Sequence, residues 1–139
     1  MAYTDYVTGY AGNYNVGKKI LDEEITLSRY WATATDGALT AAAFYKFFSV
    51  PANFVLLEAY VICDTAETTS GTDDLDIVDD DSATTVFVND ANMTVNEVGA
   101  TAARKKYAAA GFICVRPNHN LDTAAFTVII KGLITNTSM

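Results

Sequence analysis

The chain has 139 residues, of which 50% are hydrophobic and 19% are charged, so it is too apolar for a disordered protein and suits one domain with one hydrophobic core. Its net charge of −8 argues against nucleic-acid binding, because that affinity comes largely from cations that neutralise phosphates. The longest apolar stretch, residues 54–63, is interrupted by Glu58 and is too short to cross a membrane.

The N-terminal part is rich in tyrosine, glycine and asparagine. Tyr3, Tyr6, Tyr10 and Tyr14 are spaced three or four residues apart, but the glycines and asparagines between them oppose a stable helix. We therefore predict an extended N-terminal arm and linker over residues 1–41. The chain starts with neither a basic segment nor an apolar one, so we expect no signal peptide.

Within this first part, residues 25–31 alternate as a strand does, and residues 33–37 form a turn. From residue 42 onward, aromatic and β-branched residues dominate, which favours strands. The expected strands lie at residues 43–50, 54–63, 75–78, 84–88, 93–98, 112–116 and 124–134, with a bulge at Lys131-Gly132. Short strands separated by turns predict an all-β fold, a jelly-roll-like β-sandwich over residues 42–139.

The residue types offer little catalytic chemistry. His119 is the only histidine and lies in a polar turn, whereas Cys63 and Cys114 lie inside apolar runs, where we expect buried, reduced thiols. A Cys–His pair would need these thiols to meet the turn histidine. The chain contains no nucleophile-elbow, zinc-protease, P-loop or C-x-x-C motif. We predict that it is not an enzyme and needs no cofactor.

Six aspartates fall within nine positions, from Asp73 to Asp81. Ca²⁺ prefers closely spaced carboxylates, which makes Asp76, Asp79 and Asp81 weak candidate ligands. An EF-hand loop starting at Asp74 would have a valine at a ligand position and would lack the central glycine and terminal glutamate. We therefore predict solvated acidic loops and no metal site.

Charge is unevenly distributed along the chain. Residues 47–103 contain no lysine or arginine and 11 acidic residues, whereas basic residues outnumber acidic ones from residue 104 onward. We expect an acidic, solvated side and a less acidic side that faces a partner. Tyrosine supplies large contact area at low entropic cost, so the four arm tyrosines, Tyr3, Tyr6, Tyr10 and Tyr14, are the predicted partner-binding residues.

Four motifs follow one another along residues 44–134. They are Phe48-Ser49-Val50-Pro51-Ala52-Asn53-Phe54-Val55-Leu56-Leu57-Glu58-Ala59, then Thr68-Thr69-Ser70-Gly71, Leu75-Asp76-Ile77, and Phe126-Thr127-Val128-Ile129-Ile130-Lys131-Gly132. Their order resembles the small β-sandwich decoration, or cement, proteins of tailed-bacteriophage heads. This chain departs from that pattern at Asp79-Asp80-Asp81, where the family often has glycine.

The resemblance implies a homotrimer on the outer surface of a capsid. Such a protein binds the major capsid protein, bridges neighbouring capsomers and stabilises the shell, and it belongs to the virion after assembly in the host cytoplasm. The alternative is a carbohydrate-binding or host-adhesion jelly roll of a phage fibre or spike. In that case Trp31, Tyr60 and the acidic loops would form the sugar platform.

Overall fold

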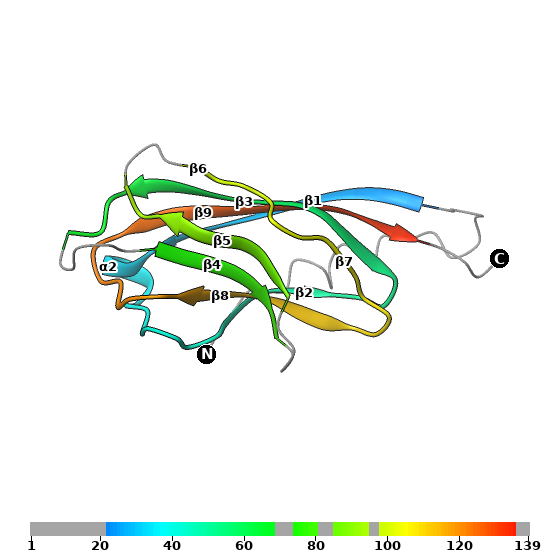
Figure 1. Cartoon of the computed structure of the whole chain (residues 1–139), viewed down its shortest axis with the longest axis horizontal. Helices are drawn as coiled ribbons and strands as arrows, with labels where there is room; N and C mark the ends of the chain where they lie inside the picture. The colour runs from blue at the N-terminus through cyan, green and yellow to red at the C-terminus, as the bar shows by residue number, and fades with distance from the viewer. Residues whose placement is uncertain (1–21, 69–73, 81–84, 95–97, 136–139) are drawn as a thin grey trace.

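The computed structural model describes residues 22–68, 74–80, 85–94 and 98–135. These residues form nine strands and one single-turn helix: β1 Asp22–Ala32, α2 Thr33–Asp36, β2 Tyr45–Val50, β3 Phe54–Thr65, β4 Asp74–Asp79, β5 Val86–Asn92, β6 Val98–Gly99, β7 Lys105–Lys106, β8 Gly111–Pro117 and β9 Ala125–Thr135. Within the described residues, the paired strands run antiparallel. The strands build two layers that face each other (Figure 1).

The strand order confirms the predicted all-β sandwich and its jelly-roll character. One sheet has the order β1-β9-β3-β6, with β7 also beside β3, and the other has the order β2-β8-β4-β5. Without the two-residue β7, the chain crosses from one four-stranded sheet to the other at every step except that from β4 to β5, which is the connectivity of an eight-stranded jelly roll. The β-rich composition and regular turns were sufficient to predict this architecture.

The boundary that we predicted at residue 42 is wrong for the described residues before it. All eleven residues of β1 pair with β9 in one continuous register, from Asp22 opposite Thr135 to Ala32 opposite Ala125. Ile25 and Leu27 are buried, whereas Thr26 and Ser28, which alternate with them, are exposed. This is the alternation of a strand with one face on a core. The sandwich therefore includes β1, and only residues 1–21 remain as a predicted arm.

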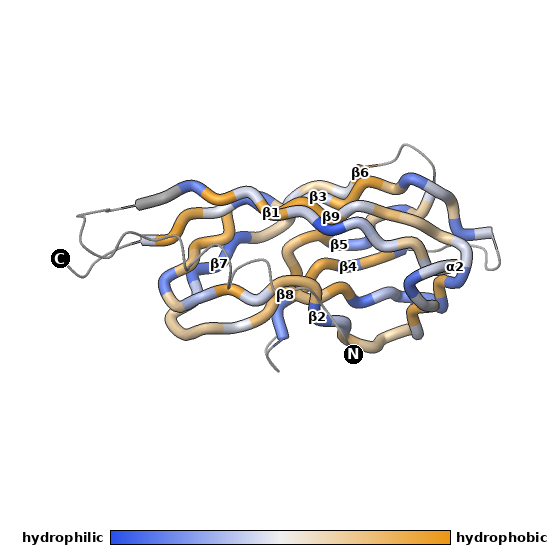
Figure 2. The backbone as a smooth tube through the Cα atoms, turned by 180° about the vertical axis from the view of Figure 1, so that it is seen from behind, coloured by the Kyte–Doolittle hydropathy of each residue, from blue (hydrophilic) through white to orange (hydrophobic). Residues whose placement is uncertain are grey.

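The core lies between the two sheets. Phe47 of β2 stacks on Phe126 of β9, with ring centroids 6.0 Å apart and planes inclined by 10°. Both rings are fully buried, as are Phe54, Leu56 and Ile77. In Figure 2 hydrophobic residues recur along the strands of both layers. Burial of these side chains supplies the main driving force for folding.

The predicted bulge lies across from its expected position. β3 and β9 shift register between Leu56 and Glu58, opposite Gly132 and Lys131, so the extra residue is Leu57 on β3. A side chain at Gly132 would collide with the ring of Phe54 and with the backbone. The glycine signal therefore marks the close approach of the partner strand.

Candidate interaction surfaces

The four arm tyrosines, Tyr3, Tyr6, Tyr10 and Tyr14, lie outside the described residues, and so does Asp81. Their partner contacts remain a prediction. The other singled-out residues, which are Trp31, Tyr60, Asp76, Asp79, the two cysteines and His119, are placed by the structure.

The expectation that Asp76 and Asp79 lie in solvated loops is wrong. They belong to β4 and are 2% and 0% exposed. Successive residues of a strand point to opposite faces, so Asp79 shares the inward face with Leu75 and Ile77, and Asp76 lies on the outward face. Buried carboxylates need partners, and each has a cation and a backbone N–H.

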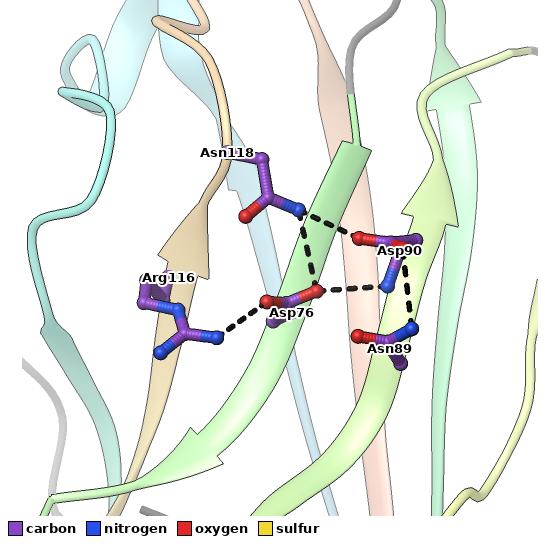
Figure 3. A network of polar contacts seen from close by, with 5 residues as sticks. All are labelled: Asp76, Asn89, Asp90, Arg116 and Asn118. Carbon is purple, nitrogen blue, oxygen red and sulfur yellow. Dashed lines mark hydrogen bonds and ion pairs between the residues drawn. The ribbon is translucent and has the colours of Figure 1, made fainter.

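Asp76 is the centre of a polar network that joins three strands of the second sheet (Figure 3). Arg116 of β8 donates from Nη2 to Asp76 Oδ2 at 2.7 Å. The backbone N–H of Asp90, a residue of β5 with a φ of 53°, donates to Asp76 Oδ1 at 2.8 Å. Asn118 donates to both Asp76 and Asp90, and Asn89 donates to Asp90.

This network explains an irregularity between β4 and β5. The register shifts between Leu75 and Ile77, so Asp76 faces the two residues Asn89 and Asp90. Such a bulge leaves an N–H without a ladder partner, and the Asp76 carboxylate accepts it. The aspartate therefore stabilises the sheet where the strand ladder is interrupted.

Asp79 connects the two sheets. Lys105 of β7 donates from Nζ to Asp79 Oδ2 at 2.7 Å, and the backbone N–H of Thr85 donates to Asp79 Oδ1 at 3.0 Å. The Lys105 side chain is 26% exposed, whereas that of Asp79 is fully buried. Because β4 and β7 belong to different sheets, this ion pair closes one side of the sandwich.

These partners also bear on the candidate metal site. Among the described residues, no three histidine, cysteine, aspartate or glutamate side chains are grouped to hold a metal ion. Asp76 and Asp79 direct their carboxylates at Arg116 and Lys105 instead. The arrangement supports a structural role for both aspartates.

Glu67 is an important residue that the sequence did not reveal. It is 8% exposed, and its Oε1 accepts three backbone N–H groups, those of Asp122, Thr123 and Ala124, at 2.9, 2.9 and 3.0 Å. A carboxylate with several backbone donors forms strong, charge-assisted hydrogen bonds. Glu67 therefore fixes the segment after β3 to the turn before β9. No local motif marks it, because its donors lie some 55 residues further along the chain.

Both thiols are buried and free, as predicted. Burial raises the pKa of Cys114 to about 12 and also raises the pKa of Cys63. His119 is in an exposed turn, as predicted, and its Nδ1 lies 3.5 Å from Asp74 Oδ1. The thiolate is the nucleophilic form of cysteine, so Cys63 and Cys114 do not supply a nucleophile near neutral pH.

A shallow depression of about 470 Å³ lies over β3 and the segment after β6. Its lining consists of Leu57, Glu58, Tyr60, Ala100, Thr101 and Arg104. The Tyr60 hydroxyl donates to Glu58, and this hydrogen bond raises the pKa of Tyr60. Arg104 donates from Nε to the carbonyl of Leu57 at 3.0 Å. Most of these polar groups already have partners within the fold, which is typical of a strand edge satisfied by side chains.

Trp31 is held in the sandwich and does not form a free aromatic platform. Its indole lies 5.6 Å from the Phe47 ring, and its N–H donates to the carbonyl of Gly37 at 2.9 Å. The Arg29 guanidinium lies over both rings, 5.3 Å from that of Trp31 and 4.6 Å from that of Phe47. These contacts give the tryptophan a packing role.

In the part of the chain that the structure describes, no helix has the length and apolar character to span a membrane.

No protein-family profile and no curated protein sequence matches the chain. Solved structures that are similar in fold include three chains, each from a phage capsid. In the acidic stable capsid structure of Helicobacter pylori bacteriophage KHP30, the matched chain has a TM-score of 0.60 and 8% identity, with 84% of this chain and 95% of that chain covered.

The second match, from the capsid asymmetric unit of cyanophage Pam1, has a TM-score of 0.56 and 12% identity, covering 81% of this chain and 84% of that one. The third, from the capsid of Ralstonia phage GP4, has a TM-score of 0.55 and 16% identity, covering 99% and 100%. Identities this low establish similarity of fold. The coverage shows that each matched chain is of comparable length to this one.

Proposed function

We propose that this chain is a structural protein of a phage virion, which binds the outer surface of the capsid and stabilises it by bridging neighbouring capsomers. The observation that carries this proposal is the match, over 81% to 99% of this chain, to three chains of comparable length, each from a phage capsid. A small jelly roll that is a whole chain of a capsid structure suits an accessory component seated on the shell. The motif resemblance to decoration proteins supports the same role independently.

The proposed partners are the major capsid protein and other copies of this chain, arranged as a homotrimer. Individual contacts can be modest, because engagement at several sites raises effective affinity without new kinds of contact. The arm tyrosines, Tyr3, Tyr6, Tyr10 and Tyr14, would contact a neighbouring subunit. Aromatic side chains of this kind are enriched in the buried centres of protein interfaces.

A structural role also agrees with the placement of the reactive groups. Cys63 and Cys114 are buried thiols with raised pKa values, and His119 is an exposed residue beside Asp74. Nucleophilic catalysis needs a nucleophile and a base within hydrogen-bond reach, and these groups do not form such a pair. The buried carboxylates hold the sandwich together.

Co-sedimentation tests the proposal. The purified full chain is mixed with capsids assembled from the major capsid protein of the same virus, and bound protein is measured against concentration. We expect saturable binding, and at least a tenfold loss of affinity when all four arm tyrosines are changed to alanine. The matched control is Phe44→Ala, which removes an exposed aromatic ring outside the arm and should bind as the unchanged chain does.

Two outcomes separate the parts of this proposal. If the full chain stays in the supernatant at every concentration, capsid binding is refuted. If the four-alanine variant binds as tightly as the unchanged chain, the capsid role stands and the arm is not the contact. The urea unfolding midpoint of each variant shows whether the fold is retained.

A further inference from the structure

The lateral edges of the two sheets differ in how they are closed. On one side of the sandwich, β6 and β7 pair with β3, and the N–H of Ala102 donates to the carbonyl of Phe87 on β5 at 2.6 Å. The segment from β6 to β7 therefore covers the edges of β3 and β5 together. The Asp79–Lys105 ion pair reinforces this side.

The edge of β2 is blocked in another way. Its register against β8 shifts between Lys46 and Phe48, and bulges of this kind protect sheet edges against further pairing. Arg29 reaches across from β1 and donates from Nη1 to the carbonyls of Lys46 and Phe47, at 3.5 and 3.3 Å. Two carbonyls of this edge are thus already satisfied.

Among the described residues, β1 has neither a covering segment nor a bulge, although at its last residue the N–H of Ala32 donates to Asp36 Oδ2 at 2.9 Å. Its eleven residues pair with β9 without a register shift, and within the described residues no strand pairs with its other edge. The strand contains no proline and no lysine, the residues that most often guard an edge. Its charged residues are Asp22, Glu23 and Glu24 at its start and Arg29, which reaches across to β2. Its outward side chains Thr26, Ser28 and Tyr30 are exposed, Tyr30 by 56%. A long, regular, open edge is a template for an added strand.

We infer that the outer edge of β1 receives an extended strand from residues 1–21 of a second copy of this chain. The inference deepens the proposed function and rests on it for one premise, that many copies lie side by side on a shell. It identifies the receiving surface for the arm. Pairing copies in this way would close a long edge that the described strands leave open.

Charge supports this choice of occupant. Residues 1–21 contain Lys18, Lys19 and Asp5, a net charge of +1, so the remaining 118 residues carry −9 of the total of −8. β1 begins with Asp22, Glu23 and Glu24. Lys18 and Lys19 are attracted to this acidic start of the strand, whereas the acidic bodies repel each other. Two bodies are therefore joined more readily through the arm than face to face.

Length and residue spacing support it too. Twenty-one extended residues span up to about 70 Å, and a strand as long as β1 spans about 36 Å, so the arm can reach a neighbour and still cover the edge. Side chains two residues apart lie on the same face of a strand. Tyr6, Tyr10 and Tyr14 would therefore share one face of an added strand, next to the outward face of β1 that carries Tyr30.

Cross-linking between differently tagged full chains tests this inference without capsids. One chain carries Thr8→Cys in the arm and the other carries Ser28→Cys on the outward face of β1. A flexible bis-maleimide tolerates the unknown register. Cys63 and Cys114 are at most 1% exposed and do not compete. The matched control replaces Ser28→Cys with Asn92→Cys, an exposed position on β5, the edge strand of the other sheet.

We expect a product that contains both tags from the Thr8→Cys and Ser28→Cys pair, at least fivefold more than from the Asn92→Cys control. Adding Thr26→Lys to the Ser28→Cys chain should reduce the product severalfold, because a lysine on an edge strand opposes the addition of another strand. Equal products from the two edges would overturn the inference. So would a Thr8→Cys/Ser28→Cys double variant that cross-links only within itself, since the arm would then pair with its own β1.

The failures of the two proposals are distinguishable. If the chain forms the cross-link but does not sediment with capsids, the strand exchange stands and the capsid role is refuted. If the chain binds capsids but does not form the cross-link, the capsid role stands and the strand exchange is refuted.

Discussion

Lys105 Nζ lies 2.7 Å from Asp79 Oδ2, and this contact joins the two sheets of the sandwich at a carboxylate that is fully buried. The aspartate ends β4, and the lysine is in the two-residue strand β7 beside β3. The pair therefore holds the β6–β7 segment in place over one side of the core. The free energy that this ion pair contributes to folding depends on how much of the Lys105 side chain remains in contact with water.

Asp79→Asn should lower the free energy of unfolding by about 2–3 kcal/mol. Removing one partner from a fully buried ion pair costs about 3–5 kcal/mol, and the partial exposure of Lys105 reduces that cost. Urea unfolding followed by circular dichroism measures the change. The control is Asp80→Asn, an exposed neighbour whose change should stay within about 0.5 kcal/mol. Equal small effects from both variants would show that the ion pair contributes little.

Asp76→Ala should destabilise the chain by about 2–4 kcal/mol. The change leaves the N–H of Asp90 without its acceptor and Arg116 without its carboxylate, and both losses carry a desolvation penalty. Amide hydrogen exchange should become faster at Asp90 before the chain unfolds globally. Asn89→Ala, which removes one exposed hydrogen bond, is the comparison and should cost under about 1 kcal/mol. An unchanged exchange rate at Asp90 would contradict the assigned role.

Glu67→Ala should release the turn before β9. Three backbone N–H groups lose a shared acceptor, which predicts a loss of about 3 kcal/mol. Glu67→Gln keeps one oxygen acceptor but removes the charge, so we expect a loss of about 1 kcal/mol. Hydrogen exchange at residues 122–124 reports the contact directly. Protection that is the same in the unchanged chain and the alanine variant would refute the clamp.

The two cysteines should be unreactive in the folded chain. At pH 8 a thiol reagent such as DTNB should find no fast-reacting thiol in the native protein and two after unfolding in guanidinium chloride. Burial raises the folded-state pKa of Cys114 to about 12, above the ordinary thiol value of 9.0. The stability that Cys114 contributes is therefore complete below pH 9 and is lost as the pH rises from 9 toward 12. One fast-reacting thiol in the native chain would contradict the burial described here.

Local pattern predicted the strands better than the position of the polar residues. The alternation of residues 25–31 indicated β1, but the alanine- and threonine-rich stretch after it was interpreted as a linker, so the sandwich was expected to begin too late. That stretch includes α2 and returns to the fold through Leu39, which bridges to Leu121. A contact of this sequence separation leaves no local signal.

The aspartates show the same limit. Alternation in Asp74-Leu75-Asp76-Ile77 indicates a strand with its aspartates on one face, yet sequence alone does not show whether that face is solvated. Arg116 is 40 residues from Asp76, and Lys105 is 26 residues from Asp79. Only the folded sheets bring these cations to the aspartates. The burial of Asp76 and Asp79 therefore could not be predicted from the acidic cluster by itself. The bulge was predicted at Lys131-Gly132 on β9 but lies at Leu57 on β3, the strand opposite. The glycine that permits the bulge is thus on the partner strand.

Cryo-electron microscopy of the virus particle tests the central claim most directly. A reconstruction at near-atomic resolution, compared with one of particles that lack this chain, shows where the chain is bound. Our account predicts two-layered β-sandwich density on the outer surface, contacting at least two capsomers per assembly and absent from the particles without the chain. Identical shells in the two reconstructions, or the sandwich found only at a fibre or spike, would contradict it.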